Sequence, residues 1–158
     1  MTKELEKPEA APMTAPRIEH LNMVVTAIDP TVKFLRAAFP HWDIRGEGGG
    51  AWAGVPRRWV HVGDADNYIT LNEFLLPDAA RGRHRDLQGA EPGLAHIGFE
   101  VSDLNDVVER LKDAGYEPHH LGEEHPHRRN LYYIDAEGLE FEFVEYSSTV
   151  PAEKNLYQ

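Results

Sequence analysis

The sequence repeats one pattern of side chains at a constant offset of 76 residues. The segment IEHLNMVV at 18–25 aligns without a gap with LAHIGFEV at 94–101, so that His20 falls on His96. Apolar positions keep coinciding through the segment that follows each of them. A repeat of this kind indicates one supersecondary unit that is used twice. A chain of 158 residues therefore predicts one domain made of two modules.

Each module reads as a strand, a helix and three further strands. In the first module, Asp29 and Pro30 predict the N-cap and the first helical residue. In the second, Asp103 or Ser102 predicts the cap, and Gly115 predicts the helix end. The remaining strand-like segments are 42–48, 57–63 and 67–75, and then 116–121, 130–135 and 139–146. The sequence therefore predicts an α+β fold of two βαβββ modules.

Composition marks where the modules begin and end. The first 16 residues hold three prolines and three glutamates without a periodic apolar pattern, which predicts a flexible leader. A stretch rich in charge, glycine and proline separates the two repeats and predicts a linker. The expected parts are a leader 1–16, a first module 17–77, a linker 78–92, a second module 93–147 and a tail 148–158.

The charge balance excludes several classes of partner. With 27 Asp and Glu against 16 Lys and Arg, the net charge is −11, which argues against binding to nucleic acid or to an anionic membrane surface. No apolar stretch is long enough to cross a bilayer, and the acidic, proline-containing N-terminus lacks the apolar core of a signal peptide. We therefore expect a cytoplasmic protein whose partner is a small-molecule substrate.

Three polar side chains interrupt the apolar strands in a consistent way. Alternate residues of a strand share a face, and Glu142 lies opposite Phe141 and Phe143. His20 and His96 likewise oppose the apolar residues of their own strands. All three side chains are thus predicted to point away from the apolar layer. Because the chain has no cysteine, a metal bound there would need histidine, carboxylate or amide ligands.

The closing stretch RNLYYIDAEGLEFEF places Gly138 in a turn and Glu142 four residues later, on the last strand. Together with the paired histidines, it resembles the vicinal oxygen chelate superfamily, which contains glyoxalase I, extradiol dioxygenases, methylmalonyl-CoA epimerase and antibiotic-resistance proteins. The resemblance covers most of the chain. It implies a cup-shaped mixed β-sheet with helices outside and a divalent metal at the bottom of the cup, held by His20, His96 and Glu142.

The fourth ligand of glyoxalase-like members would come from NYITLNEF at 67–74. If Ile69 and Leu71 face the helix, the aligned position inside the cup is Asn72. A neutral amide is a poor substitute for a carboxylate, both as a ligand and as a base. Glu73 could be the fourth ligand only if a bulge shifted the register of the strand by one residue.

Without a fourth anion, the set is two histidines and one carboxylate, the facial triad that leaves positions open on non-haem Fe(II). Extradiol dioxygenases of this superfamily take their ligands from corresponding strands, and the resemblance implies that Tyr132 matches their catalytic tyrosine. A nearby histidine would act as the acid and base, with His125 favoured over His120. His61 is a candidate substrate contact inside the cup, together with Asn72.

Iron(II) is therefore the favoured cofactor, with nickel, zinc and manganese as alternatives. The favoured function is a metal-dependent, dioxygenase-like enzyme whose small substrate chelates the metal through vicinal oxygens. The first alternative is a glyoxalase-type lyase or isomerase, and the second is a drug-binding or resistance protein without catalysis. The cup forms either within one chain or from modules exchanged in a homodimer.

Overall fold

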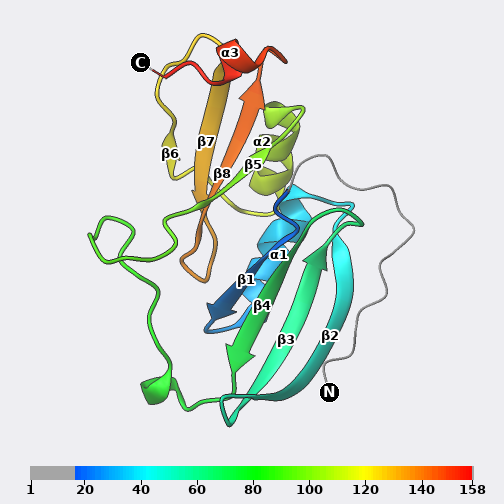
Figure 1. The fold of residues 1–158 in the computed structure, drawn as a ribbon, viewed down its shortest axis with the longest axis vertical. Coiled ribbons are helices and arrows are strands. Elements are labelled where there is room, and N and C mark those ends of the chain that lie inside the picture. The colour runs from blue at the N-terminus through cyan, green and yellow to red at the C-terminus, as the bar shows by residue number, and fades with distance from the viewer. Residues whose placement is uncertain (1–16, 158) are drawn as a thin grey trace, which may run out of the picture.

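The computed structural model describes residues 17–157, which form two separate four-stranded sheets and three α-helices (Figure 1). The first sheet joins, in spatial order, β1 (His20–Val25), β4 (Tyr68–Phe74), β3 (Val55–Gly63) and β2 (Asp43–Trp52). The second joins β5 (Ile97–Glu100), β8 (Glu140–Tyr146), β7 (Arg128–Ile134) and β6 (His120–Leu121). The helices are α1 (Ile28–Ala38), α2 (Leu104–Asp113) and α3 (Pro151–Lys154), with a 3-10 turn, η1, at Asp78–Ala80.

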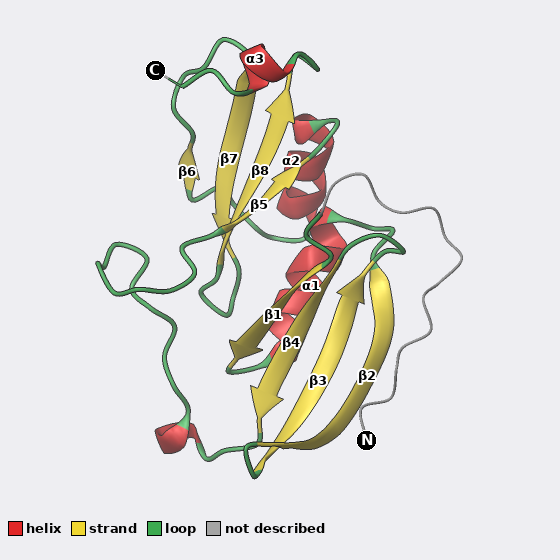
Figure 2. Ribbon diagram, viewed as in Figure 1, coloured by secondary structure: helices red, strands yellow, loops and turns green. Residues whose placement is uncertain are grey.

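The two sheets have the same topology, as the internal repeat predicts. The first strand of each module runs parallel to the last strand, and the other neighbouring strands are antiparallel. The α+β class and the two βαβββ modules are therefore confirmed. The sheets do not close into one continuous cup within the chain, and the long segment between β4 and β5 connects them as an open loop (Figure 2).

One apolar core holds both modules together. On the first sheet the buried apolar residues alternate along β1, β3 and β4, as Val60 and Val62 do on β3, and this face packs toward α1. The α1 residue Phe34 also stacks on Phe141 of β8, with ring centroids 4.8 Å apart, and it is completely buried. Figure 2 shows α1 and α2 behind the sheets. Because one helix contacts both sheets, the modules fold as parts of a single domain.

The two main helices begin differently. Asp103 caps α2 by accepting hydrogen bonds from the backbone N–H groups of Asn105 and Asp106, at 2.9 and 3.1 Å. The prediction that Asp29 caps α1 is wrong, because α1 already begins at Ile28 and has no side-chain cap from Ala27. Its first N–H instead donates to Oε2 of Glu73 on β4, at 3.1 Å.

Strand lengths also differ from the prediction. The first hairpin extends through a glycine-rich stretch to a two-residue turn at Ala53 and Gly54, both with positive φ, which matches the twist of a tight hairpin. Glycine lowers strand propensity, which is why the sequence predicted an earlier end of β2.

β6 is only two residues long, and the expected tail contains α3. The predicted leader, residues 1–16, lies outside the described residues. No helix among residues 17–157 is long and apolar enough to cross a membrane.

A buried carboxylate joins the modules at the start of α1. Glu137, in the turn before β8, accepts hydrogen bonds from the N–H and hydroxyl of Thr26 and from the N–H of Ala27. Its Oε2 also lies 3.2 Å from Nε2 of His84, in the connecting loop. Burial pulls the pKa of Glu137 upward, but the hydrogen bonds from Thr26, His84 and Ala27 outweigh it, so the pKa lies below its ordinary value.

Replacing Glu137 with glutamine should destabilise the protein by about 1.5–3 kcal/mol at neutral pH, the range for hydrogen bonds to a charged group. Because the folded-state pKa is lowered, the stabilisation from the carboxylate is complete above the unfolded pKa of about 4.5 and is lost as the pH falls through the folded pKa. Urea unfolding at neutral and acidic pH measures both effects. Glu124→Gln, at an exposed site, is the control, and an equal loss in that variant would contradict the assignment.

Candidate metal centre

The second sheet brings two predicted ligands together. Nε2 of His96 lies 3.2 Å from Oε2 of Glu142, close enough for both atoms to bind one ion at the usual ligand distances of about 2.0–2.2 Å. His96 lies directly before β5 rather than within it, since the strand begins at Ile97. Gly98 pairs in register with Glu142, and its lack of a side chain keeps the space beside Oε2 open.

The other oxygen of Glu142 is held by two neighbours on β7. Oε1 accepts hydrogen bonds from Nδ2 of Asn130 and from the hydroxyl of Tyr132, the latter at 2.9 Å. A Cβ at Gly122 would lie only 1.8 Å from Oδ1 of Asn130, so a glycine there makes room for the amide. Sequence reasoning did not find Asn130, although its position two residues before Tyr132 places both on one strand face.

A second carboxylate, Glu140, lies on the same face of β8. Its Oε2 is 3.8 Å from Nδ1 of His96, and its Oε1 is 3.3 Å from Nε2 of His120. The His120 ring stacks on Tyr132 with centroids 4.0 Å apart. His119, His120 and Glu140 also form a trio whose ligand atoms lie within 4.8 Å of one another.

A cavity of about 620 Å³ lies beside this cluster, on the inner face of the second sheet. Its lining includes His120, Asn130, Tyr132 and Glu142. Burial is the main cause that raises the pKa of Tyr132 to about 12. The hydrogen bond to Glu142 and the negative charge of that carboxylate also raise it. The phenol is therefore a hydrogen-bond donor at neutral pH.

The first sheet presents His20 in a similar setting. Nδ1 of His20 lies 2.6 Å from Oε2 of Glu19, and its ring stacks on Tyr68 with centroids 4.9 Å apart. The His61 ring stacks on the same tyrosine, also at 4.9 Å, and contacts Trp59. Burial and then the positive charges of Arg45 and His20 lower the pKa of His61. Glu19 was not identified from the sequence, where it was one of many acidic residues.

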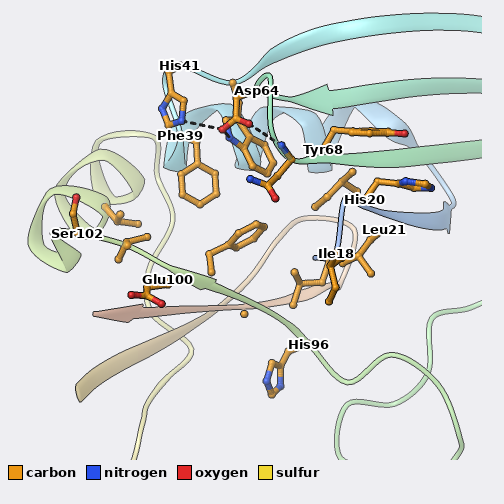
Figure 3. Close-up of a pocket in the computed structure, with 18 of the residues that line it drawn as sticks. Ile18, His20, Leu21, Phe39, His41, Asp64, Tyr68, His96, Glu100 and Ser102 are labelled. Carbon is orange, nitrogen blue, oxygen red and sulfur yellow. Dashed lines mark hydrogen bonds and ion pairs between the residues drawn. The ribbon is translucent and has the colours of Figure 1, made fainter. Parts of the chain in front are cut away.

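His20 does not join the other two ligands within one chain. The ligand atoms of His20, His96 and Glu142 do not all lie within 4.8 Å of one another; among residues 17–157 the trio that meets this distance is the one containing Glu140. A groove of about 720 Å³ runs between the modules and is lined by both histidines. Figure 3 shows that their rings do not point toward each other across it.

The position equivalent to Glu142 in the first module is Thr70, not Asn72. Asn22 pairs with Thr70 in the same way that its repeat partner Gly98 pairs with Glu142. The gapless alignment fails for the last strand because the first module has the longer hairpin between β2 and β3. The corrected position is again neutral, so the first module supplies no carboxylate there.

The neighbouring residues of β4 point to opposite sides of the sheet. Glu73 lies on the helix side, where it binds the N-terminus of α1. Asn72 is buried on the other side, where Nδ2 donates to Oδ1 of Asn22 at 2.6 Å and Oδ1 accepts from Arg57. His125 lies away from the Glu142 cluster, with its Nε2 2.9 Å from the backbone oxygen of Leu156.

Residues 17–143 match the family model of the Glyoxalase/Bleomycin resistance protein/Dioxygenase superfamily. The chain belongs to the vicinal oxygen chelate superfamily. A comparison with curated protein sequences finds no match.

Solved structures agree with this vicinal oxygen chelate fold. A glyoxylase/bleomycin resistance protein/dioxygenase domain from Frankia sp. EAN1pec is 22% identical, with a TM-score of 0.65 over 84% of this chain and 99% of that one. A glyoxalase family protein from Bacillus cereus is 21% identical, with a TM-score of 0.68 over 88% and 99%. The fosfomycin resistance protein FosX from Listeria monocytogenes, complexed with Mn(II) and sulfate, is 19% identical, with a TM-score of 0.55 over 89% and 98%.

Replacing Glu142 with glutamine should lower the pKa of Tyr132 from about 12, because the variant loses the negative charge beside the phenol while burial still keeps the pKa above its ordinary value. Carbon-13 NMR of labelled tyrosine in chelator-treated protein measures the titration, and Tyr132→Phe assigns the signal. Glu145→Gln removes a carboxylate that binds Arg129 instead, so it should leave the titration unchanged. An unaltered Tyr132 pKa in Glu142→Gln would show that the carboxylate does not act on the phenol.

Proposed function

We propose that the protein is a metal-dependent enzyme in which His20, His96 and Glu142 bind one divalent ion. The proposal rests on a feature that both histidines share, a contact with a carboxylate. Nδ1 of His20 faces Glu19 and Nδ1 of His96 faces Glu140, which directs Nε2 of each ring to a ligand. Metal-binding histidines usually have such a carboxylate or carbonyl partner, which fixes the ring and increases its basicity.

Two copies of the chain would complete each site. His20 lies on the first sheet, away from the ligand pair on the second, and neither sheet closes on itself. A homodimer in which the first sheet of one copy covers the second sheet of the other would bring the three ligands together and form the cup. The edges of β1 and β5, unpaired among residues 17–157, allow this closure.

The ligand set favours iron(II), because two histidines and one carboxylate leave positions open for substrate and dioxygen. Nickel, zinc and manganese remain alternatives, and the manganese in FosX from Listeria shows that this fold can hold that ion. When bound, the metal would polarise the two adjacent oxygens of the substrate. The substrate class is a catechol-like molecule, and the proposed reaction is ring cleavage by dioxygen.

The protein groups around the site supply the proton transfers. His120 replaces His125 as the preferred acid and base, because it stacks on Tyr132 beside the cavity while His125 binds the C-terminal segment. Tyr132 donates a hydrogen bond to substrate oxygens, in keeping with its protonated state at neutral pH. His61 contacts the substrate from the opposite half of the cup.

A glyoxalase-type isomerisation is the second candidate. Its support is Glu140, a half-buried carboxylate next to Glu142 that provides a base beside the ligands. Thr70, at the position equivalent to Glu142, cannot serve as the fourth anionic ligand that such an enzyme would use.

The metal site and its division between two copies can be tested together. His20→Ala and the double variant His96→Ala/Glu142→Ala should each lose most of the bound metal measured by elemental analysis, while the matched control His127→Ala keeps it. Refolding the two defective variants together should restore metal, because a mixed dimer contains one intact site. If mixing restores nothing although both variants fold and dimerise, the shared site is wrong. If the triple variant His20→Ala/His96→Ala/Glu142→Ala binds metal normally, the ligand set is wrong.

The reaction is tested in an oxygen electrode. Protein loaded anaerobically with Fe(II) should consume dioxygen with a member of a catechol panel, and His96→Ala should not, because the metal is lost. Nickel- or zinc-loaded protein is assayed in parallel with a hemithioacetal. Isomerisation without oxygen uptake would replace the dioxygenase reaction with the second candidate, and bound metal without turnover in either assay would indicate a binding or resistance protein.

A further inference from the structure

The inner face of the first sheet carries Arg57, which lies on the same face of β3 as Trp59 and His61. Among residues 17–157, no carboxylate lies within ion-pair distance of Arg57. Its Nη1 donates to Oδ1 of Asn72, and its guanidinium lies 5.4 Å from the centroid of the Trp52 ring. The next residue, Arg58, faces the other side of the sheet and pairs with Asp29 at 2.6 Å.

The amide that holds Arg57 is itself fixed. Asn72 is 1% exposed, and its Nδ2 donates to Oδ1 of Asn22 at 2.6 Å and to the backbone oxygen of Met23 at 3.1 Å. Its Oδ1 is therefore directed at the guanidinium. Because this acceptor is neutral, it orients Arg57 without cancelling the charge. Among residues 17–157 this oriented cation has no acidic partner, which indicates that its partner is a ligand.

Aromatic rings lead from this arginine toward His20. Trp59 lies two residues along β3 on the same face, and its ring packs against β2 so closely that a Cβ at Gly48 would be 2.8 Å from Cζ2. Neighbouring ring centroids are 4.8–4.9 Å apart along the series Trp59, His61, Tyr68 and His20. A planar molecule on this surface would have one end at the cation and the other toward the metal ligand.

We propose that Arg57 is an anion-binding subsite for the charged group of a planar organic acid. A planar guanidinium presents parallel N–H donors that match the oxygens of a carboxylate or a phosphonate. The subsite extends the proposed function. It rests on that function only for the end of the substrate that binds the metal. The substrate would thus be an aromatic acid that chelates through adjacent oxygens remote from its acid group.

The subsite can be tested without metal. Calorimetric titration of full-length, chelator-treated protein with benzoate, phenylphosphonate and the neutral isostere benzamide should show binding of at least one acid and much weaker binding of benzamide. Arg57→Gln should reduce affinity for that acid about tenfold or more, the loss typical of a charge-assisted hydrogen bond. The matched control Arg58→Gln should bind as the wild type does. The affinities for benzoate and phenylphosphonate show whether the subsite prefers a carboxylate or a phosphonate.

Arg57→Lys keeps the charge but removes the planar fork, so it should bind the acid with intermediate affinity, and circular dichroism checks that each variant is folded. Absence of binding by both acids, equal binding of benzamide, or equal losses in Arg57→Gln and Arg58→Gln would overturn the proposal. Since the measurement is made without metal, failure of the metal site would leave its outcome unchanged.

Discussion

The packing of α1 against both sheets determines how the rest of the molecule is arranged. Phe34 is completely buried and contacts aromatic rings of the second sheet, although its helix belongs to the first module. Glu137 and Asp135 reinforce the junction, since Asp135 accepts a hydrogen bond from the buried hydroxyl of Thr31 at 2.5 Å. Burial raises the pKa of Asp135, and the Thr31 hydrogen bond opposes that shift. A polar junction of this kind fixes one relative orientation of the modules, because a shift would leave buried groups unpaired.

This arrangement has a direct consequence for the site. With the helices packed on one side of both sheets, the polar side chains of both sheets lie on the other side. Each sheet then offers half of a cup. His20 and its neighbour Glu19 lie on one half, and the pair of His96 and Glu142 lies on the other, so the proposed ligand set is divided by the same packing that makes the chain one domain.

The two halves have diverged although they share a topology. Strand register makes Thr70 equivalent to Glu142 and His61 equivalent to Tyr132. The second module holds an anionic cluster in which Glu142 is oriented by Asn130 and Tyr132. The first module holds stacked rings and a cation instead. A duplicated module can change in this way because the apolar face of each strand maintains the fold while the alternate residues are free to vary.

The sequence by itself determined the two modules, their strand and helix order, and which residues lie on the polar face of each strand. Periodicity carries this information, because burying one face of a strand fixes the direction of every side chain along it. Glu142 was placed on the polar face of the last strand for this reason, whereas His96 lies directly before β5. The equivalence of Thr70 and Glu142 could not be found in this way, because hairpin length changes the sequence spacing between strands without changing their pairing.

Only the tertiary structure decided that His20 lies apart from His96 and Glu142, that Glu140 faces His96, and that Arg57 has no acidic partner among residues 17–157. These facts depend on contacts between residues far apart in the chain and on the orientation of one sheet relative to the other. Local periodicity contains no information on either. Asn72 shows the difference most plainly, since the sequence placed it on the inner face and the fold determined that it holds an arginine there.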